Sequence, residues 1–105
     1  MAEVYRIHVG DFTSSGASIT TGIHSGMVVG IYATHTTSDA ATFTVVDEVG
    51  YNLFGKSGSS GNVTSSASCQ KDQEDLDGTA IVGPITVTSG GTVSGTLSVF
   101  IYVAP

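Results

Sequence analysis

The sequence predicts an all-β protein, an antiparallel β-sandwich of about seven to eight strands of the jelly-roll or immunoglobulin-like kind. Val, Ile and Thr, which favour strands, are plentiful, while the helix-favouring Leu, Lys, Arg, Glu and Gln are scarce. Several segments alternate apolar and polar residues with a period of two, as strands with one buried face do. Turn residues separate them at spacings typical of a two-sheet sandwich. At 105 residues, the chain is expected to form one domain over residues 1–105.

The clearest alternation lies at the C-terminal end, where a long hairpin is expected to form the centre of the fold. Residues 92–103 place a row of branched apolar side chains on one face: Val93, Leu97, Val99, Ile101 and Val103. The partner strand is expected at residues 81–88, joined through a Ser89-Gly90-Gly91 turn. Pro84 has no amide proton, so it is expected at a strand start, a sheet edge or a bulge.

The other strands follow from shorter alternating runs. In chain order, these runs predict a strand over residues 4–9 closed by Gly10-Asp11 and a weaker strand over 17–23 followed by a turn at Ser25-Gly26. A central strand is predicted over 27–35, with one face formed by Met27, Val29, Ile31 and Ala33. A strand over 42–49, with Phe43, Val45 and Val49 inward, and a short edge strand over 63–68 follow. The Gly- and Ser-rich residues 56–62 predict a loop.

Charge excludes several classes of partner. The net charge of −6, with only 3 Lys and Arg residues, argues against binding nucleic acid or an anionic membrane. The apolar runs are far shorter than the roughly 20 residues of a membrane span, and residues 1–3 do not begin a signal peptide. The protein is therefore expected to be made and used in the cytosol, to leave by lysis, or to have lost a signal.

A single cysteine, Cys69, excludes an internal disulfide and predicts an incidental loop thiol.

Three patterns in the sequence, of acidic, histidine and glycine residues, bear on sites for chemistry. The acidic residues 72–77 do not fit a helix-flanked calcium loop, because Gln73 and Pro84 would fill its first and twelfth positions. Two interpretations of this stretch are left, a looser ion site and a solvated acidic loop. His24 and His35 flank one strand at opposite ends, so with His8 they predict no shared metal site within a subunit. The string Gly50-x4-Gly55-Lys56-Ser57 matches a phosphate-binding loop but lacks a following helix. No catalytic set and no cofactor are predicted, so the protein is not expected to be an enzyme.

Residues 83–91 followed by residues 95–103 resemble the C-terminal hairpin of small β-sandwich virion proteins of tailed bacteriophages. The resemblance implies a capsid decoration (cement) protein, or a neck, tail or head-fibre component, that is made in the host cytoplasm and located in the virion. Its expected partner is the major capsid protein or another virion protein. The alternative is a carbohydrate-binding β-sandwich, for which exposed aromatic side chains would form the platform; the sequence has no Trp.

Two sets of residues are predicted to make contacts with partners. Bulky outer-face rings would form an apolar patch on a monomer, which predicts a homo-oligomer, with a trimer favoured by analogy and an interface of Tyr32, Phe100 and Tyr102. Partner docking is assigned to Lys56 in the Gly-rich loop and to the acidic residues Asp72, Glu74, Asp75 and Asp77. The acidic residues are expected to dock on Lys or Arg of a shell protein.

Overall fold

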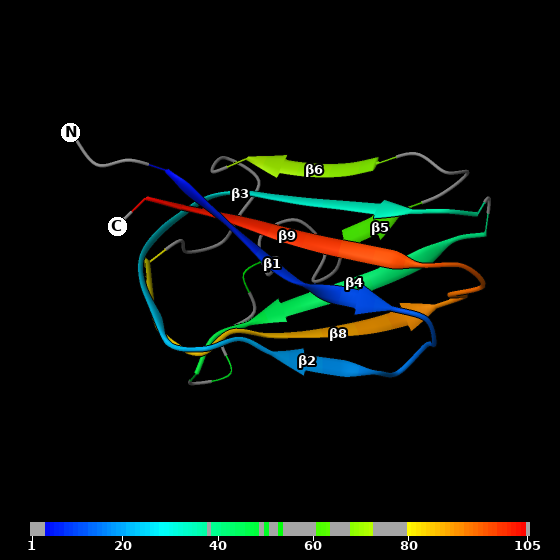
Figure 1. Cartoon of the computed structure of the whole chain (residues 1–105), viewed down its shortest axis with the longest axis horizontal. Helices are drawn as coiled ribbons and strands as arrows, with labels where there is room; N and C mark the ends of the chain where they lie inside the picture. Colours follow the sequence, from blue (N-terminus) through cyan, green and yellow to red (C-terminus); the bar gives the residue numbers. More distant parts are fainter. Residues whose placement is uncertain are drawn as a thin grey trace.

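The computed structural model describes residues 4–37, 39–48, 50, 53, 61–63, 68–72 and 80–104, without the side chains of 61–63, 68–72, 80 and 82. In this part of the chain, nine strands form two antiparallel sheets (Figure 1). The first sheet has the order β1 (Tyr5–Phe12), β9 (Leu97–Ala104), β3 (His24–His35) and β6 (Ser68–Asp72), and β7 (Ala80–Gly83) pairs with β3. The second sheet has the order β2 (Ser18–Thr20), β8 (Thr86–Gly91), β4 (Ala41–Val46) and β5 (Gly61–Val63).

The predicted all-β class with two antiparallel sheets is confirmed, but the predicted number of seven to eight strands is wrong. Six strands have five or more residues, namely β1, β3, β4, β6, β8 and β9. The three others have three or four residues; β2 lies within the strand predicted over 17–23, and β7 and β8 replace the single strand predicted over 81–88. Within the described ranges, no helix is long and apolar enough to span a membrane.

The core lies between the inner faces of the two sheets. Strand β9 alternates buried and half-buried residues along its whole length, as the sequence predicted for residues 97–103. The largest fully buried side chains come from both sheets and from the links between strands, and include Phe12, Ile31, Phe43, Leu53, Ile85, Leu97 and Ile101. Because each sheet contributes one apolar face, the opposite faces remain available to solvent or to partners.

The predicted C-terminal hairpin is wrong, because its two strands belong to different sheets. Strand β8 pairs with β2 and β4, whereas β9 pairs with β1 and β3. Ser89, which was assigned to the turn, is a buried residue of β8, and its hydroxyl donates to the Ser14 carbonyl oxygen at 2.7 Å. At Gly91 the chain adopts φ = +64°, and a Cβ there would lie 2.8 Å from the Ala40 carbonyl oxygen. The link that follows therefore crosses from one sheet to the other.

Two β-bulges alter the predicted faces of β1 and β3. The pairing of β1 with β9 shifts between His8 and Gly10, so the strand does not close at Gly10 but continues to the buried Phe12. The pairing of β3 with β9 shifts between Val28 and Gly30. Val28 is consequently buried, while Met27, which was predicted to share a face with Ile31, is 44% exposed. Each bulge adds one residue and reverses the inward alternation beyond it.

Several strand bounds also differ from the sequence prediction. Residues 21–23 lie outside β2, and Ser25-Gly26, predicted as a turn, lies within β3. The strand predicted over 42–49 ends at Val46 with Phe43 and Val45 inward as expected, while Val49 lies outside the described residues. The strand predicted over 63–68 coincides only with the end of β5 and the start of β6. The central place of β3 is confirmed. Pro84 was predicted at a strand start, a sheet edge or a bulge, but it lies outside both strands, in the link between β7 and β8.

Buried His35 ties together two loops at one end of the sandwich. The Gly95 amide donates to His35 Nε2 at 3.2 Å, so this nitrogen carries no proton, and Nδ1 donates to the Asp39 carbonyl oxygen at 3.0 Å. Beside the ring, the Ser94 hydroxyl donates to Asp39 Oδ2 at 2.6 Å and contacts the Thr37 hydroxyl at 2.7 Å. The β3–β4 and β8–β9 links are thereby joined through one neutral imidazole.

Replacing Leu97 by Asp is expected to destabilise the fold by about 4 kcal/mol or more, because it buries an unpaired charge in the core. Thr44→Asp, which adds the same charge on the half-exposed outer side of β4, is the control and should cost less than about 1 kcal/mol. Urea unfolding of both variants measures the difference. Equal stability of the two variants would show that the inner face of β9 is wrongly assigned.

Replacing His35 by Phe is expected to cost about 2 to 4 kcal/mol, because the Gly95 amide and the Asp39 carbonyl lose their partner. His24→Phe removes an imidazole from the half-buried start of β3 and is the matched control. Thermal and urea unfolding measure the loss. A His35→Phe protein as stable as wild type would refute the role of the imidazole in joining the two loops.

Candidate functional site

The outer face of the first sheet collects rings, one cation and hydrogen-bonding groups in three rows that run across the strands. The strand pairing sets these rows, which are Arg6–Tyr102–Gly30, His8–Phe100–Tyr32 and Asp11–Ser98–Thr34 from β1, β9 and β3. Continuing the same register into β6 places Asp72, Gln70 and Ser68 at the ends of the rows. We call this surface the mosaic face.

Phe100 is the centre of the mosaic face. The His8 ring stacks against it with centroids 4.7 Å apart and an interplanar angle of 23°. The guanidinium carbon of Arg6 lies 5.1 Å from the Phe100 centroid, within the range of a cation–π contact. Tyr32 approaches from β3 with its ring centroid 6.3 Å away. The ring of Phe100 is therefore half-buried by its own neighbours and does not stand free.

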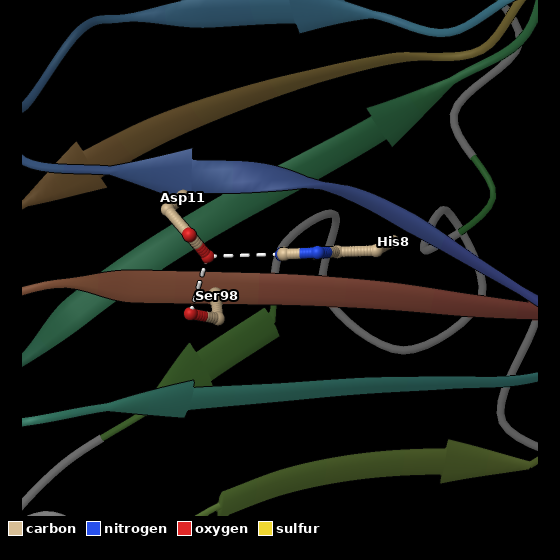
Figure 2. Close-up of polar contacts among 3 residues, drawn as sticks. All are labelled: His8, Asp11 and Ser98. Atoms are coloured by element: carbon tan, nitrogen blue, oxygen red, sulfur yellow. Dashed lines mark hydrogen bonds and ion pairs between the residues drawn. The ribbon is translucent and has the colours of Figure 1, made fainter.

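His8, Asp11 and Ser98 form a polar cluster beside these rings (Figure 2). Asp11 Oδ1 accepts hydrogen bonds from the Ser98 hydroxyl at 2.7 Å and from His8 Nε2 at 2.9 Å. Residues three apart lie on opposite faces of a regular strand, and the bulge between them brings His8 and Asp11 to the same face. The Ser98 hydrogen bond, and secondly that of His8, lowers the pKa of Asp11 below its ordinary value of 3.8.

The cluster differs from a Ser–His–Asp catalytic triad in the order of its members. In a triad the imidazole lies between the serine and the carboxylate and takes the serine proton. Here the carboxylate lies between the two others, and Ser98 donates to Asp11 instead of to His8 (Figure 2). This geometry offers Ser98 no imidazole base and corresponds to a surface hydrogen-bond cluster.

The structure brings together the three rings that were predicted as an oligomer interface. Tyr32 and Phe100 are directly paired across β3 and β9, and Tyr102 follows on the same side of β9. All three are half-buried. That these rings form an interface between copies of the chain stays a prediction.

The residues predicted for partner docking are only partly located. Asp72 is the last residue of β6, and its backbone alone is described. Lys56, Glu74, Asp75 and Asp77 lie outside the described residues, as does most of the Gly- and Ser-rich segment around Lys56. The docking role of the acidic stretch therefore stays a prediction.

The three histidines and the cysteine have separate surroundings. His24 and His35 occupy the two ends of β3, and His8 is on β1 beside Asp11, in agreement with the predicted separation. Within the described ranges, no group of three or more His, Cys, Asp or Glu residues could hold a metal ion. Cys69 was predicted in a loop, which is wrong, because it lies in β6 paired with Ala33.

The outer face of the second sheet has a different chemistry. Apart from Val46 at the end of β4, it presents short hydroxyl side chains from β2, β8 and β4: Ser18, Thr20, Thr42, Thr44, Thr86 and Thr88. Ser18 and Thr88 share a hydrogen bond of 2.8 Å, and Thr20 and Thr86 share one of 2.9 Å. We call this surface the hydroxyl face. None of the four strands of this sheet contains a charged residue.

Alternation over residues 4–9 places Arg6 and His8 on one face, but reasoning from the sequence missed Asp11 as a member of the same surface. Strict alternation places Asp11 opposite His8, and Gly10-Asp11 was taken to end the strand. The available signal was Gly10 inside the run from Val9 to Phe12, since a glycine inside a strand often marks a bulge or a close approach. A Cβ at residue 10 would collide with the Ile19 side chain, so the close approach is real.

Replacing Ser98 by Ala is expected to raise the pKa of Asp11 toward 3.8, because the larger of the two lowering hydrogen bonds is lost. A pKa that is lowered in the folded state stabilises the fold above the ordinary value, and this contribution is lost as pH falls through the lowered pKa. The variant should therefore lose less stability than wild type on acidification below about pH 4. Thr34→Ala, in the same row, is the control.

An NMR titration that follows the Asp11 carboxyl carbon measures the pKa directly in both variants. An unchanged Asp11 titration in the Ser98→Ala protein, with its fold intact, would contradict the hydrogen bond shown in Figure 2.

No known family model matches the chain. No curated protein matches it at the sequence level either. Solved structures match its fold: the SPBc2 prophage-derived protein YomS aligns with 14% identity over 100% of this chain and 96% of that chain, at a TM-score of 0.60.

Carbohydrate-binding modules share the same architecture. CsCBM6-3 from Clostridium stercorarium, solved in complex with cellobiose, has 17% identity over 96% of this chain and 80% of that chain, at a TM-score of 0.58. The C-terminal CBM6 of LamC from Zobellia galactanivorans has 11% identity over 98% of this chain and 100% of that chain, at a TM-score of 0.59. At these identities the likeness establishes a shared two-sheet fold, one that both a prophage-derived protein and carbohydrate-binding modules adopt.

Proposed function

We propose that this chain is a non-catalytic virion structural protein of a tailed phage that decorates the capsid shell and stabilises it. Its partners are the major capsid protein and further copies of itself, and it resides in the virion after synthesis in the host cytoplasm. The observation that carries this proposal is the hydroxyl face, an uncharged sheet surface made mainly of Ser and Thr side chains.

The hydroxyl face suits repeated docking on a protein lattice. Ser and Thr side chains are short, so a partner surface can approach the sheet closely and little rotamer entropy is lost on contact. Mutual hydrogen bonds such as Ser18–Thr88 already hold some of these hydroxyls in place. Many weak contacts of this kind add up when several linked copies bind a symmetric shell together.

The fold is compatible with this role without selecting it. YomS, a prophage-derived protein, has the same architecture over nearly the whole length of both chains. A sugar-binding function is the second candidate, since CsCBM6-3 was solved with cellobiose and the mosaic face carries three rings. The covering of Phe100 by His8 and Arg6 favours the virion role, because a sugar platform requires a free ring face.

The acidic stretch that begins at Asp72 is assigned to electrostatic docking. The chain has a net charge of −6, so a complementary site on the shell would be rich in Lys or Arg. Replacing Asp72, Glu74 and Asp75 with Asn, Gln and Asn should weaken capsid binding at low salt and make the remaining binding less sensitive to salt. The same acid-to-amide change at Asp47, outside the stretch, is the control.

Co-sedimentation of the full chain with empty capsids of the source virus tests the proposal across a series of salt concentrations. Saturable binding at a fixed ratio to the major capsid protein is expected. Binding only to neck, tail or fibre fractions would move the protein to those locations. An absence of co-sedimentation at every salt concentration, together with specific binding on a glycan array, would replace the proposal by the sugar-binding function.

A further inference from the structure

The mosaic face carries residues of opposite charge in its two outer rows, although the guanidinium of Arg6 leans toward Phe100 in the central row. Arg6 lies in the first row and Asp11 in the third, with the His8–Phe100–Tyr32 row between them. The first and third rows are four residues apart along β9, from Tyr102 to Ser98, which corresponds to roughly 13 Å at the rise of a strand. Both charged side chains are exposed.

Arg6 keeps its hydrogen-bonding capacity unused within the described part of the chain. The contact that the structure gives its guanidinium is the ring of Phe100, at 5.1 Å from the centroid. A cation–π contact occupies no lone pair, so the five N–H donors of the guanidinium keep their hydrogen-bonding capacity. These donors match the geometry of a carboxylate, which Arg binds in a bidentate manner.

Asp11 has the matching free acceptor. Both of its hydrogen bonds, from Ser98 and from His8, end on Oδ1, and Oδ2 is left with its acceptor positions open. The carboxylate is ionised at neutral pH and its side chain is 52% exposed. The cluster thus fixes the orientation of a carboxylate that still has one oxygen to offer (Figure 2).

From this arrangement we propose that a second copy of this chain binds the mosaic face, around a two-fold axis that lies along the His8–Phe100–Tyr32 row. This rotation stacks the two sheets face to face and reverses the strand direction, which exchanges the first and third rows. Arg6 of each copy then lies over Asp11 of the other, and the two central rows meet each other. Such a contact is isologous, so each copy contributes the same residues twice.

The dimensions and chemistry of the face agree with this contact. Sheets packed face to face lie about 10 Å apart, a gap that one long Arg and one short Asp side chain can bridge. The half-buried rings of Tyr32, Phe100 and Tyr102 would lose their remaining contact with water. Two reciprocal charge pairs at the ends would fix the register and offset part of the repulsion between two copies of net charge −6.

The inference deepens the self-association in the proposed function, and it replaces the trimer implied by the resemblance with an even-numbered assembly. It rests on the proposed function only for the presence of like copies and does not depend on the capsid partner. The hydroxyl face, on the other sheet, stays free for docking in such a dimer. Failure of capsid co-sedimentation and failure of dimerisation are therefore separate results.

Sedimentation equilibrium of the full-length wild-type chain, from micromolar to millimolar concentration, is the primary test. A monomer–dimer equilibrium is expected. Arg6→Asp and Asp11→Arg should each weaken dimerisation by about tenfold or more, because each places like charges opposite one another. The double variant Arg6→Asp/Asp11→Arg exchanges the charges, restores both pairs across the interface and should recover most of the wild-type affinity.

Thr44→Asp adds a charge to the hydroxyl face and should leave the dimer unchanged. Circular dichroism and thermal unfolding confirm that each variant is folded. A second measurement does not depend on the charged variants: Tyr32→Cys in a Cys69→Ser background lies on the proposed axis, so a bifunctional maleimide that spans about 10 Å should link two chains. A cysteine introduced instead at Thr88, on the hydroxyl face, should give no linked dimer.

Dimerisation that the single variants weaken and the double variant recovers, with crosslinking at residue 32, establishes the contact. A monomer throughout the concentration range overturns the inference, as does a trimer that is unaffected by the charge reversals. A folded double variant without recovered dimerisation also overturns it. A wild-type monomer that binds acidic glycans through Arg6 would assign the mosaic face to a sugar ligand instead.

Discussion

The strict alternation of β9 is the constraint on which the first sheet depends. β9 lies between β1 and β3, and its inner residues Leu97, Val99, Ile101 and Val103 are fully buried. Burying this row requires Ser98, Phe100 and Tyr102 to face outward at the middle of the sheet. Both neighbouring strands adjust to β9 through a bulge, which keeps their own apolar residues directed inward. The core and the mosaic face are therefore two consequences of one periodic strand.

Sequence patterns predicted the parts of the fold that depend on period alone. The inner rows of β9 and β4 follow from alternation, since a half-buried strand needs it, and the central position of β3 follows from the apolar residues on both of its faces. The bulges were not predicted, because one extra residue in β1 or β3 reverses the faces without leaving a break in composition. The hairpin prediction failed for another reason. Ser89-Gly90-Gly91 satisfies the local rules for a turn, but strand pairing is decided by the whole sandwich, where β8 and β9 bury their apolar faces from opposite sides.

The residues of the candidate site also divide into those that sequence patterns predicted and those that they did not. Phe100 and Tyr102 were identified because large rings at outer positions of a strand are conspicuous in a sequence rich in Ser and Thr. Arg6, His8 and Asp11 were not connected with them, because their proximity depends on a register between β1 and β9 that spans most of the chain. The two outer faces also differ in kind, one with rings and charges, the other with short hydroxyls. A module with two unlike faces can associate with itself on one side and with a different surface on the other.

The placement of β9 also affects when the protein can fold. The strand that holds β1 and β3 together is the last of the described strands in the chain, and its partner β1 is the first. While the polypeptide is being synthesised, β1 and β3 must wait without their common neighbour, exposing apolar faces and open backbone groups. Pairings between such distant segments are slow to form, since a long loop must close before they contribute. The first sheet therefore assembles late, after β9 has been synthesised. Until then, the exposed faces and edges of β1 and β3 can associate with the wrong partner.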